Sequence, residues 1–237
     1  MTLFFLLQTF LLIYISYLSG RLVLKILKFN PETNIKRFVY PIMLGYGVLG
    51  NFGLILALLG IYKQFYFYIF FLLIVFASRN IIYKKFLWIT NLSDRLRDVK
   101  IIFKDNPFLK IIILLWSVFY LAISCMPSVL GSDGMAYHLP FAIDIINKSS
   151  IHFPMLNSLS YGHLPILTEI FYGIPILLFN NLVSFKIIQF IASIFLILLI
   201  SDFTKKYLQN KILNLILIIL ILANLPFQKN ALAGGFI

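Results

Sequence analysis

The chain has 237 residues, of which 61% are hydrophobic and 12% are charged, and its mean hydropathy is +0.97. Soluble domains are roughly half apolar and about a quarter charged, so this composition excludes a water-soluble fold, which needs polar residues to cover its exterior. The net charge is +12, but the basic residues gather between apolar runs, which is typical of a membrane topology signal and not of a nucleic-acid partner.

Apolar segments long enough to cross a bilayer follow one another along the chain. A crossing helix needs about 20 mainly apolar residues. We predict six crossings, over residues 2–19, 39–61, 64–82, 108–126, 183–203 and 211–227. The first segment lacks the basic start and the small-residue cleavage site of a secretory signal peptide, so we expect it to be retained. The predicted fold class is all-α, a polytopic transmembrane helical bundle in the cell membrane.

Charge predicts which loops are cytoplasmic. Residues 20–38 hold five basic residues and residues 79–110 hold eight, and an excess of lysine and arginine marks cytoplasmic loops. Segment 92–105 has Ser93 as a candidate N-cap and apolar residues at helical spacing. We therefore predict an interfacial helix there, on the cytoplasmic face. The loop 127–182 then lies on the extracytoplasmic face.

The apolar segment 164–180 is predicted not to cross. It is short, it contains Pro165, Gly173 and Pro175, and it carries Glu169, whose burial at the bilayer centre costs roughly a few kcal/mol. A full crossing would also place the basic run after residue 203 outside, against the charge rule. We expect a juxtamembrane or partly inserted helix on the outer side. All but four of the 20 basic residues are then cytoplasmic, the exceptions being Lys63, Lys148, Lys186 and Lys229.

The external loop 127–182 contains all the histidines of the chain and three of its acidic residues. Its histidines and acidic residues are His138, His152, His163, Asp133, Asp144 and Glu169. Connectors between helices usually have about two to eight residues, and long loops on rigid scaffolds often carry function. A solvated linker is the alternative, but here the polar groups alternate with Leu, Ile, Phe and Pro. We expect short juxtamembrane helices, one with Pro140 in its first turn.

Spacing argues against several kinds of site. The histidines lack a tight pattern such as H-E-x-x-H, so a dedicated zinc site is not predicted. The sequence has no Gly-rich phosphate loop, nucleophile elbow or Cys-His pairing. The only cysteine, Cys125, ends an apolar run and is interpreted as a small buried hydrophobe.

Two stretches of the external loop carry a resemblance to a known family. After a membrane exit come "SDGMAYHLPFAIDIINKSSIHFP" and then "SYGHLPILTEIFYG". This order resembles the first external loop of the GT-C class of integral membrane glycosyltransferases, in the branch of protein O-mannosyltransferases and the lipid A aminoarabinose transferase. The resemblance covers roughly residues 108–237. It leaves residues 1–107, predicted to hold three spans and the interfacial helix, unexplained.

The resemblance implies a reaction and a set of roles. The donor would be a polyprenyl-phosphate sugar and the acceptor, of unknown identity, would meet it on the outer face. Asp133 would act as general base or through a divalent cation, Mg or Mn. Tyr137, His138, His163 and Glu169 would bind or position substrate. Activating an acceptor hydroxyl requires a positioned carboxylate, and a leaving lipid phosphate requires cationic stabilisation, for physical reasons that do not depend on the family.

The sequence also departs from the family pattern. The family has a further acid at the next external exit and a donor-binding cation, and neither has a clear counterpart here. We therefore expect the chain to be the N-terminal part of a longer protein. Two other functions stay open: a transporter, with Glu169 in a helix broken by prolines, and a non-catalytic membrane subunit.

Overall fold

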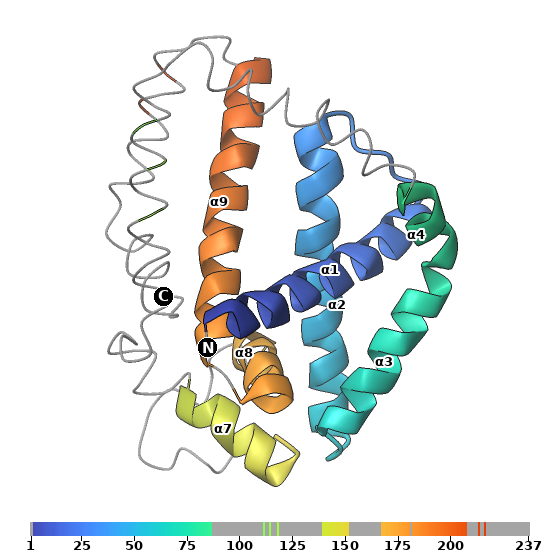
Figure 1. Ribbon diagram of the computed structural model, residues 1–237, viewed down its shortest axis with the longest axis vertical. Helices are drawn as coiled ribbons and strands as arrows, with labels where there is room; N and C mark the ends of the chain where they lie inside the picture. The colour runs from blue at the N-terminus through green and yellow to red at the C-terminus, as the bar shows by residue number, and fades with distance from the viewer. Residues whose placement is uncertain are drawn as a thin grey trace.

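The computed structural model describes residues 2–86, 139–151, 167–180 and 182–207, together with single positions at 111, 114, 118, 213 and 216. The described ranges are mostly helical and no strand occurs within them, which confirms the predicted helical class. The helices (Figure 1) are α1 (Thr2–Ile26), α2 (Asn34–Leu58), α3 (Gln64–Ala77), α4 (Arg79–Phe86), α7 (Leu139–Lys148), α8 (Leu167–Phe179) and α9 (Leu182–Tyr207).

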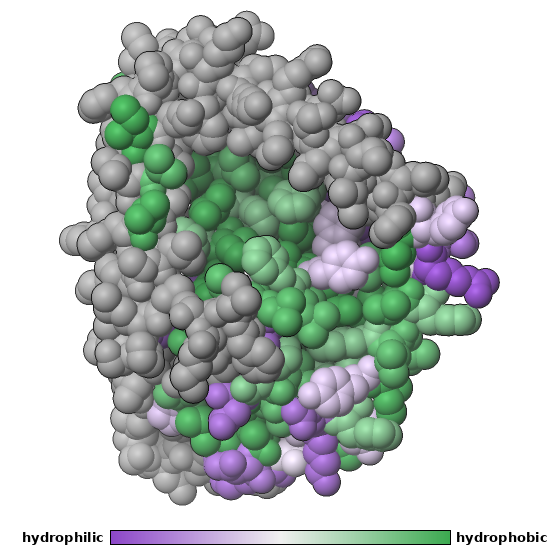
Figure 2. Space-filling view, viewed as in Figure 1, coloured by the Kyte–Doolittle hydropathy of each residue, from purple (hydrophilic) through white to green (hydrophobic). Residues whose placement is uncertain are grey.

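Within the described part of the chain, three helical segments are long and apolar enough to cross a membrane. They are Leu6–Ile26, Ile35–Leu58 and Lys186–Thr204, and they fall on the predicted spans 2–19, 39–61 and 183–203. Large apolar side chains also cover their outer surfaces (Figure 2), as with Phe10 at 64% exposed and Ile55 at 54% exposed. A helix that is apolar both inside and outside is typical of a membrane span. The predicted spans 108–126 and 211–227 and the helix 92–105 lie largely or entirely outside the described residues.

The predicted span 64–82 differs from the observed structure. Two helices replace it, α3 with 14 residues and α4 with 8 residues. At about 1.5 Å per residue, α3 is roughly 21 Å long and does not reach across a hydrocarbon core of about 30 Å. The break lies at Ser78, whose carbonyl accepts hydrogen bonds from the Ile81 and Ile82 amides at 2.8 and 2.9 Å. An apolar composition therefore did not guarantee one continuous helix.

Helices α1 and α2 cross with their backbones in direct contact. A Cβ atom at Gly45 would overlap with the carbonyl of Ser16, and one at Gly20 would overlap with the carbonyl of Pro41. Small residues at a crossing allow the close packing that associates helices in membranes. The Ser16 hydroxyl donates to the Leu12 carbonyl at 2.7 Å, so it leaves no unpaired donor at this contact.

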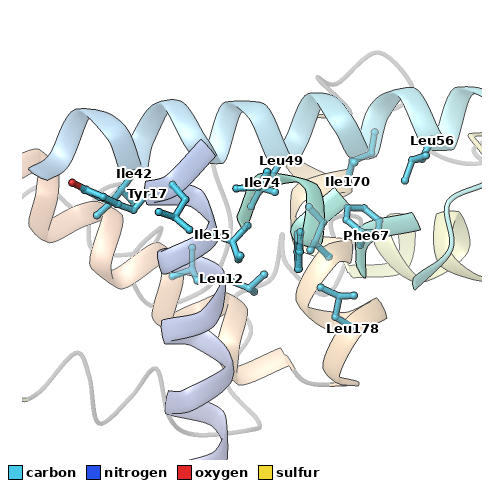
Figure 3. Close-up of a cluster of buried hydrophobic side chains, with 14 of the residues drawn as sticks. Leu12, Ile15, Tyr17, Ile42, Leu49, Leu56, Phe67, Ile74, Ile170 and Leu178 are labelled. Atoms are coloured by element: carbon cyan, nitrogen blue, oxygen red, sulfur yellow. The ribbon is translucent and has the colours of Figure 1, made fainter. Parts of the chain in front are cut away.

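One hydrophobic core joins the N-terminal helices to α8 and α9. Figure 3 shows side chains from α1, α2, α3 and α8 pointing into it, among them Leu12, Ile15, Leu49, Phe67 and Ile170. These residues are widely separated in sequence, so the core is built by tertiary packing. It fixes α8 against the first three helices.

The end of α9 is joined to the α1–α2 loop by polar contacts. The Lys206 ammonium lies 2.6 Å from Glu32, and the Lys36 ammonium lies 3.9 Å from Asp202. Thr33 caps α2 by accepting from the Lys36 amide at 3.2 Å and donates to Asp202 at 3.1 Å. A Thr at this position satisfies one of the free amides of the first helical turn. This end of the bundle is therefore closed by charge pairs.

The contact between Glu32 and Lys206 is expected to depend on pH and salt. Lys206 lowers the pKa of Glu32 below its ordinary 4.5, and Glu32 raises the pKa of Lys206 above 10.5. The stabilisation is therefore full between about pH 5 and pH 10, falls as acid protonates Glu32 and falls again as base neutralises Lys206.

A double-mutant cycle with Glu32→Gln and Lys206→Gln measures this contact. The coupling in thermal midpoint should be present at pH 7 in low salt and should decrease as the pH is lowered and Glu32 is protonated. It should vanish in about 1 M salt, because exposed pairs are screened. A coupling that persists in high salt would contradict this account.

Candidate functional site

The structure describes only one of the predicted site residues. Asp133, Tyr137, His138 and His163 lie outside the described residues. Glu169 lies in the first turn of α8 and is 3% exposed. The acidic residue that the sequence analysis expected on a juxtamembrane helix is thus buried inside the helical assembly.

Local sequence explains how α8 begins and ends. Glu169 stands near its N-terminus, where the helix dipole favours a negative charge. Pro175 lies inside the helix, where it lacks the amide that would donate to the carbonyl four residues earlier. The helix ends at Phe179, and the next residue, Asn180, has a left-handed φ of 49° and donates its amide to the Ile176 carbonyl at 2.8 Å. Asn tolerates this conformation better than most residues.

Buried polar side chains occur near the starts of α1, α8 and α9, and both α1 and α8 pack on α9. The beginning of α1 lies beside α9, and α8 packs on α9 as well (Figure 1). The polar side chains, each at most 6% exposed, are Gln8, Thr9, Glu169, Tyr172, Ser184 and Lys186, and all six take part in interactions. We refer to these six residues as the buried polar set.

Two members of the buried polar set carry an ionisable side chain of opposite type, an acid and a base. Glu169 is 3% exposed and Lys186, in the first part of α9, is 1% exposed. A charge taken out of water costs several kcal/mol unless other groups compensate it. Ionisable residues inside membrane helices usually line a substrate path or bind a ligand. Glu169 and Lys186 are therefore the described residues best placed for chemistry.

Lys186 was missed as a functional residue by the sequence analysis. It was counted among the basic residues outside the cytoplasm, as if it were part of a loop. The stretch "VSFKIIQF" could have marked Lys186 as a candidate functional residue, because it is the single lysine within the predicted span 183–203. A lysine inside a span is rarer and more informative than one in a loop.

Helix α7 brings a second acid near the same end of the bundle. Asp144 and Lys148 form an ion pair at 3.2 Å with side chains 31% and 44% exposed, while Ala142 and Ile145 are buried. Pro140 stands in the first turn, as predicted. Helix α7 packs on α8, and the ion pair, which is partly exposed, is a contact of small energetic effect.

The turn between α2 and α3 holds both α7 and α8. The Tyr62 amide donates to the Ser149 carbonyl at 2.9 Å, and the Ile151 amide donates to the Ala57 carbonyl at 3.2 Å. The Tyr62 hydroxyl donates to the Ile170 carbonyl at 2.8 Å. Burial raises the pKa of the Tyr62 hydroxyl, so it remains protonated and able to donate.

Within the described ranges, no three His, Cys, Asp or Glu side chains come close enough to hold a metal ion. Asp133 lies outside these ranges, so the divalent cation implied by the resemblance stays a prediction. The chain matches no protein-family model, no curated protein and no solved structure.

Proposed function

We propose that the protein is an integral membrane glycosyltransferase that moves a sugar from a polyprenyl phosphate to an acceptor on the extracytoplasmic face. The observation that carries the proposal is the burial of Glu169 and Lys186 near the starts of two adjacent helices, α8 and α9. A carboxylate and an ammonium group in a membrane helical bundle suit a substrate that is both lipid-borne and charged.

The arrangement of the two bundle ends supports the proposed topology. Helix α9 runs opposite to α2 (Figure 1), so its end meets Glu32 and Lys36 of the basic loop 20–38. The elements α7 and α8 of the loop 127–182 meet the α2–α3 turn at the other end. Charge asymmetry assigns the basic end to the cytoplasm, and the α7–α8 end would then be external.

The proposed reaction requires a base and a cation. Asp133 takes the proton of the acceptor hydroxyl, while the hydroxyl oxygen forms a bond to the anomeric carbon. If the site binds a divalent cation, Asp133 would hold it, and the cation would make the hydroxyl more acidic. The bond from that carbon to the phosphate oxygen breaks, and the lipid phosphate leaves with the electron pair. Lys186 is the candidate cation for that phosphate. Glu169 would position the sugar, and Tyr137, His138 and His163 are candidate contacts.

Replacing Asp133 by asparagine tests the proposal. The substitution keeps the shape and removes the base, so we expect transfer from radiolabelled polyprenyl-phosphate sugars to fall by about 10²–10⁴-fold, with an unchanged amount of protein in the membrane. Asp144→Asn, in the same loop but in a partly exposed ion pair, is the matched control, and its transfer activity should stay within about twofold of that of the unchanged chain. Equal activity of the two variants would remove Asp133 from the mechanism.

A transporter is the second candidate, because Glu169 and Pro175 both lie within the short helix α8. Transporters place ionisable groups in interrupted helices near the bilayer midplane. Single cysteines along residues 164–180 distinguish the two functions. Labelling from the external side alone supports the transferase, whereas labelling that alternates between both sides supports transport.

A further inference from the structure

We propose that Tyr62 is a positioning residue that sets the place of Glu169 through the backbone of α8. This inference rests on the proposed function for its consequence in catalysis, but the structural part stands by itself. It assigns a task to the N-terminal helices, which the family resemblance leaves unexplained. That task is to hold the α7–α8 unit against the bundle.

The first observation is the hydrogen bond from Tyr62 to α8. Tyr62 is 0% exposed, and its hydroxyl donates to the carbonyl of Ile170 at 2.8 Å. Ile170 follows Glu169 directly in the chain, so the bond is one residue away from the buried acid. A hydrogen bond in a dry interior is stronger than the same bond in water, and here it links residues 108 positions apart in sequence.

The second observation is the close fit around the Tyr62 ring. A Cβ atom at Gly173 would lie 2.8 Å from the Tyr62 hydroxyl oxygen. A Cβ atom at Gly53 would lie 2.7 Å from Ile170 and 3.3 Å from the Tyr62 ring. The ring therefore sits between α2 and α8 where only glycine leaves room, and α8 has little freedom to slide along it.

The third observation is that the same turn holds the rest of the unit. The Gln64 side-chain amide donates to the Leu178 carbonyl at 3.0 Å, in the last turn of α8, where carbonyls lack a helical partner. The Tyr62 amide holds Ser149 at the end of α7. Three neighbouring contacts thus fix α7 and both ends of α8, and Tyr62 makes two of them.

The structural test measures how readily a cysteine placed at position 169 becomes accessible to a labelling reagent. In a Cys125→Ser background, the variant Glu169→Cys places a thiol at a buried position, and its reaction with a membrane-permeant maleimide requires local opening. Adding Tyr62→Phe, which keeps the ring and removes the hydroxyl, should speed labelling about fivefold. Tyr68→Phe, at a tyrosine 45% exposed on α3, is the matched control and should leave the labelling rate unchanged.

The catalytic test uses the full chain with Glu169 intact. A displaced Glu169 binds the donor sugar less well, so Tyr62→Phe should raise KM for the polyprenyl-phosphate sugar about fivefold, with a smaller change in kcat. A variant that merely lost folded protein would lower the apparent kcat and leave KM unchanged. Gly173→Ala, which crowds the Tyr62 hydroxyl, should change KM in the same direction.

The outcomes separate this inference from the proposed function. Faster labelling together with a raised KM supports both. Faster labelling in a protein that transfers no sugar supports the positioning by Tyr62 and overturns the proposed function. Equal labelling rates for Tyr62→Phe and Tyr68→Phe, or an unchanged KM in an active protein, overturn the positioning role.

Discussion

Replacing Gly45 by alanine is expected to destabilise the protein by about 1–3 kcal/mol or more, the range found when a packed interior is overfilled. The added methyl group would overlap with the carbonyl oxygen of Ser16, and a backbone atom cannot move aside as the end of a flexible side chain can. Helix α1 would have to move away from α2 along their crossing. Since the core side chains Leu12 and Ile15 are on α1, the movement would also loosen the packing against α8.

The measurement is the thermal midpoint of detergent-purified protein, followed by size-exclusion chromatography after heating. Gly47→Ala is the matched control, because it makes the same change two residues along α2 where no atom lies within 4 Å of the added Cβ. Alanine is the better helix former, so this control should be neutral or slightly stabilising. Equal midpoints for the two variants would show that the α1–α2 contact is looser than described.

Reversing the charge of Lys186 is expected to have the second large effect. Lys186→Glu puts a carboxylate where an ammonium group is 1% exposed, on a helix that packs against the helix of the buried Glu169. Two buried acids would then lie on adjacent helices. Their desolvation costs several kcal/mol, so little correctly folded protein should be recovered from the membrane.

Lys63→Glu is the matched control for this reversal, because Lys63 is exposed in the α2–α3 turn. The recovered amount of monodisperse protein should remain near that of the unchanged chain. Lys186→Met keeps the approximate length of the side chain and removes the charge. Its recovered amount of protein should lie between those of Lys186→Glu and Lys63→Glu. Normal recovery of Lys186→Glu would show that the environment of Lys186 admits water and that its burial does not select a cation.

The sequence predicted the helical class and three of the six expected membrane spans, for a physical reason. Transfer into a bilayer depends on the summed hydrophobicity of about 20 neighbouring residues, which is a local property. Segments 2–19, 39–61 and 183–203 were therefore visible in the sequence, and so was the fact that the apolar helix within 164–180 is short. The helix break at Ser78 could not be predicted in this way, because a single residue that ends α3 hardly changes the summed hydropathy of 64–82.

The candidate site was predicted only in part. Glu169 was singled out from its place in an apolar segment with prolines, but its burial was not foreseen, because burial depends on which helices pack around α8. Lys186 was assigned to the outside by counting charges, a method that treats a lysine within a span like one in a loop. Tyr62 carried no signal at all, since a tyrosine near a turn is common.

The sequence alone thus indicated that the protein lies in a membrane, where its helices are and how the charge differs between its loops. Each of these properties depends on residues close together in the chain. Only the tertiary structure decided that α8 lies inside the assembly, that Glu169 and Lys186 are buried on adjacent helices, and that Tyr62 reaches Ile170. Those relations join residues up to more than one hundred positions apart. The α1–α2 crossing depends on how closely the backbones approach at Gly20 and Gly45, and the place of the Tyr62 ring depends on the room left at Gly53 and Gly173. Shape of this kind exists only once the helices pack.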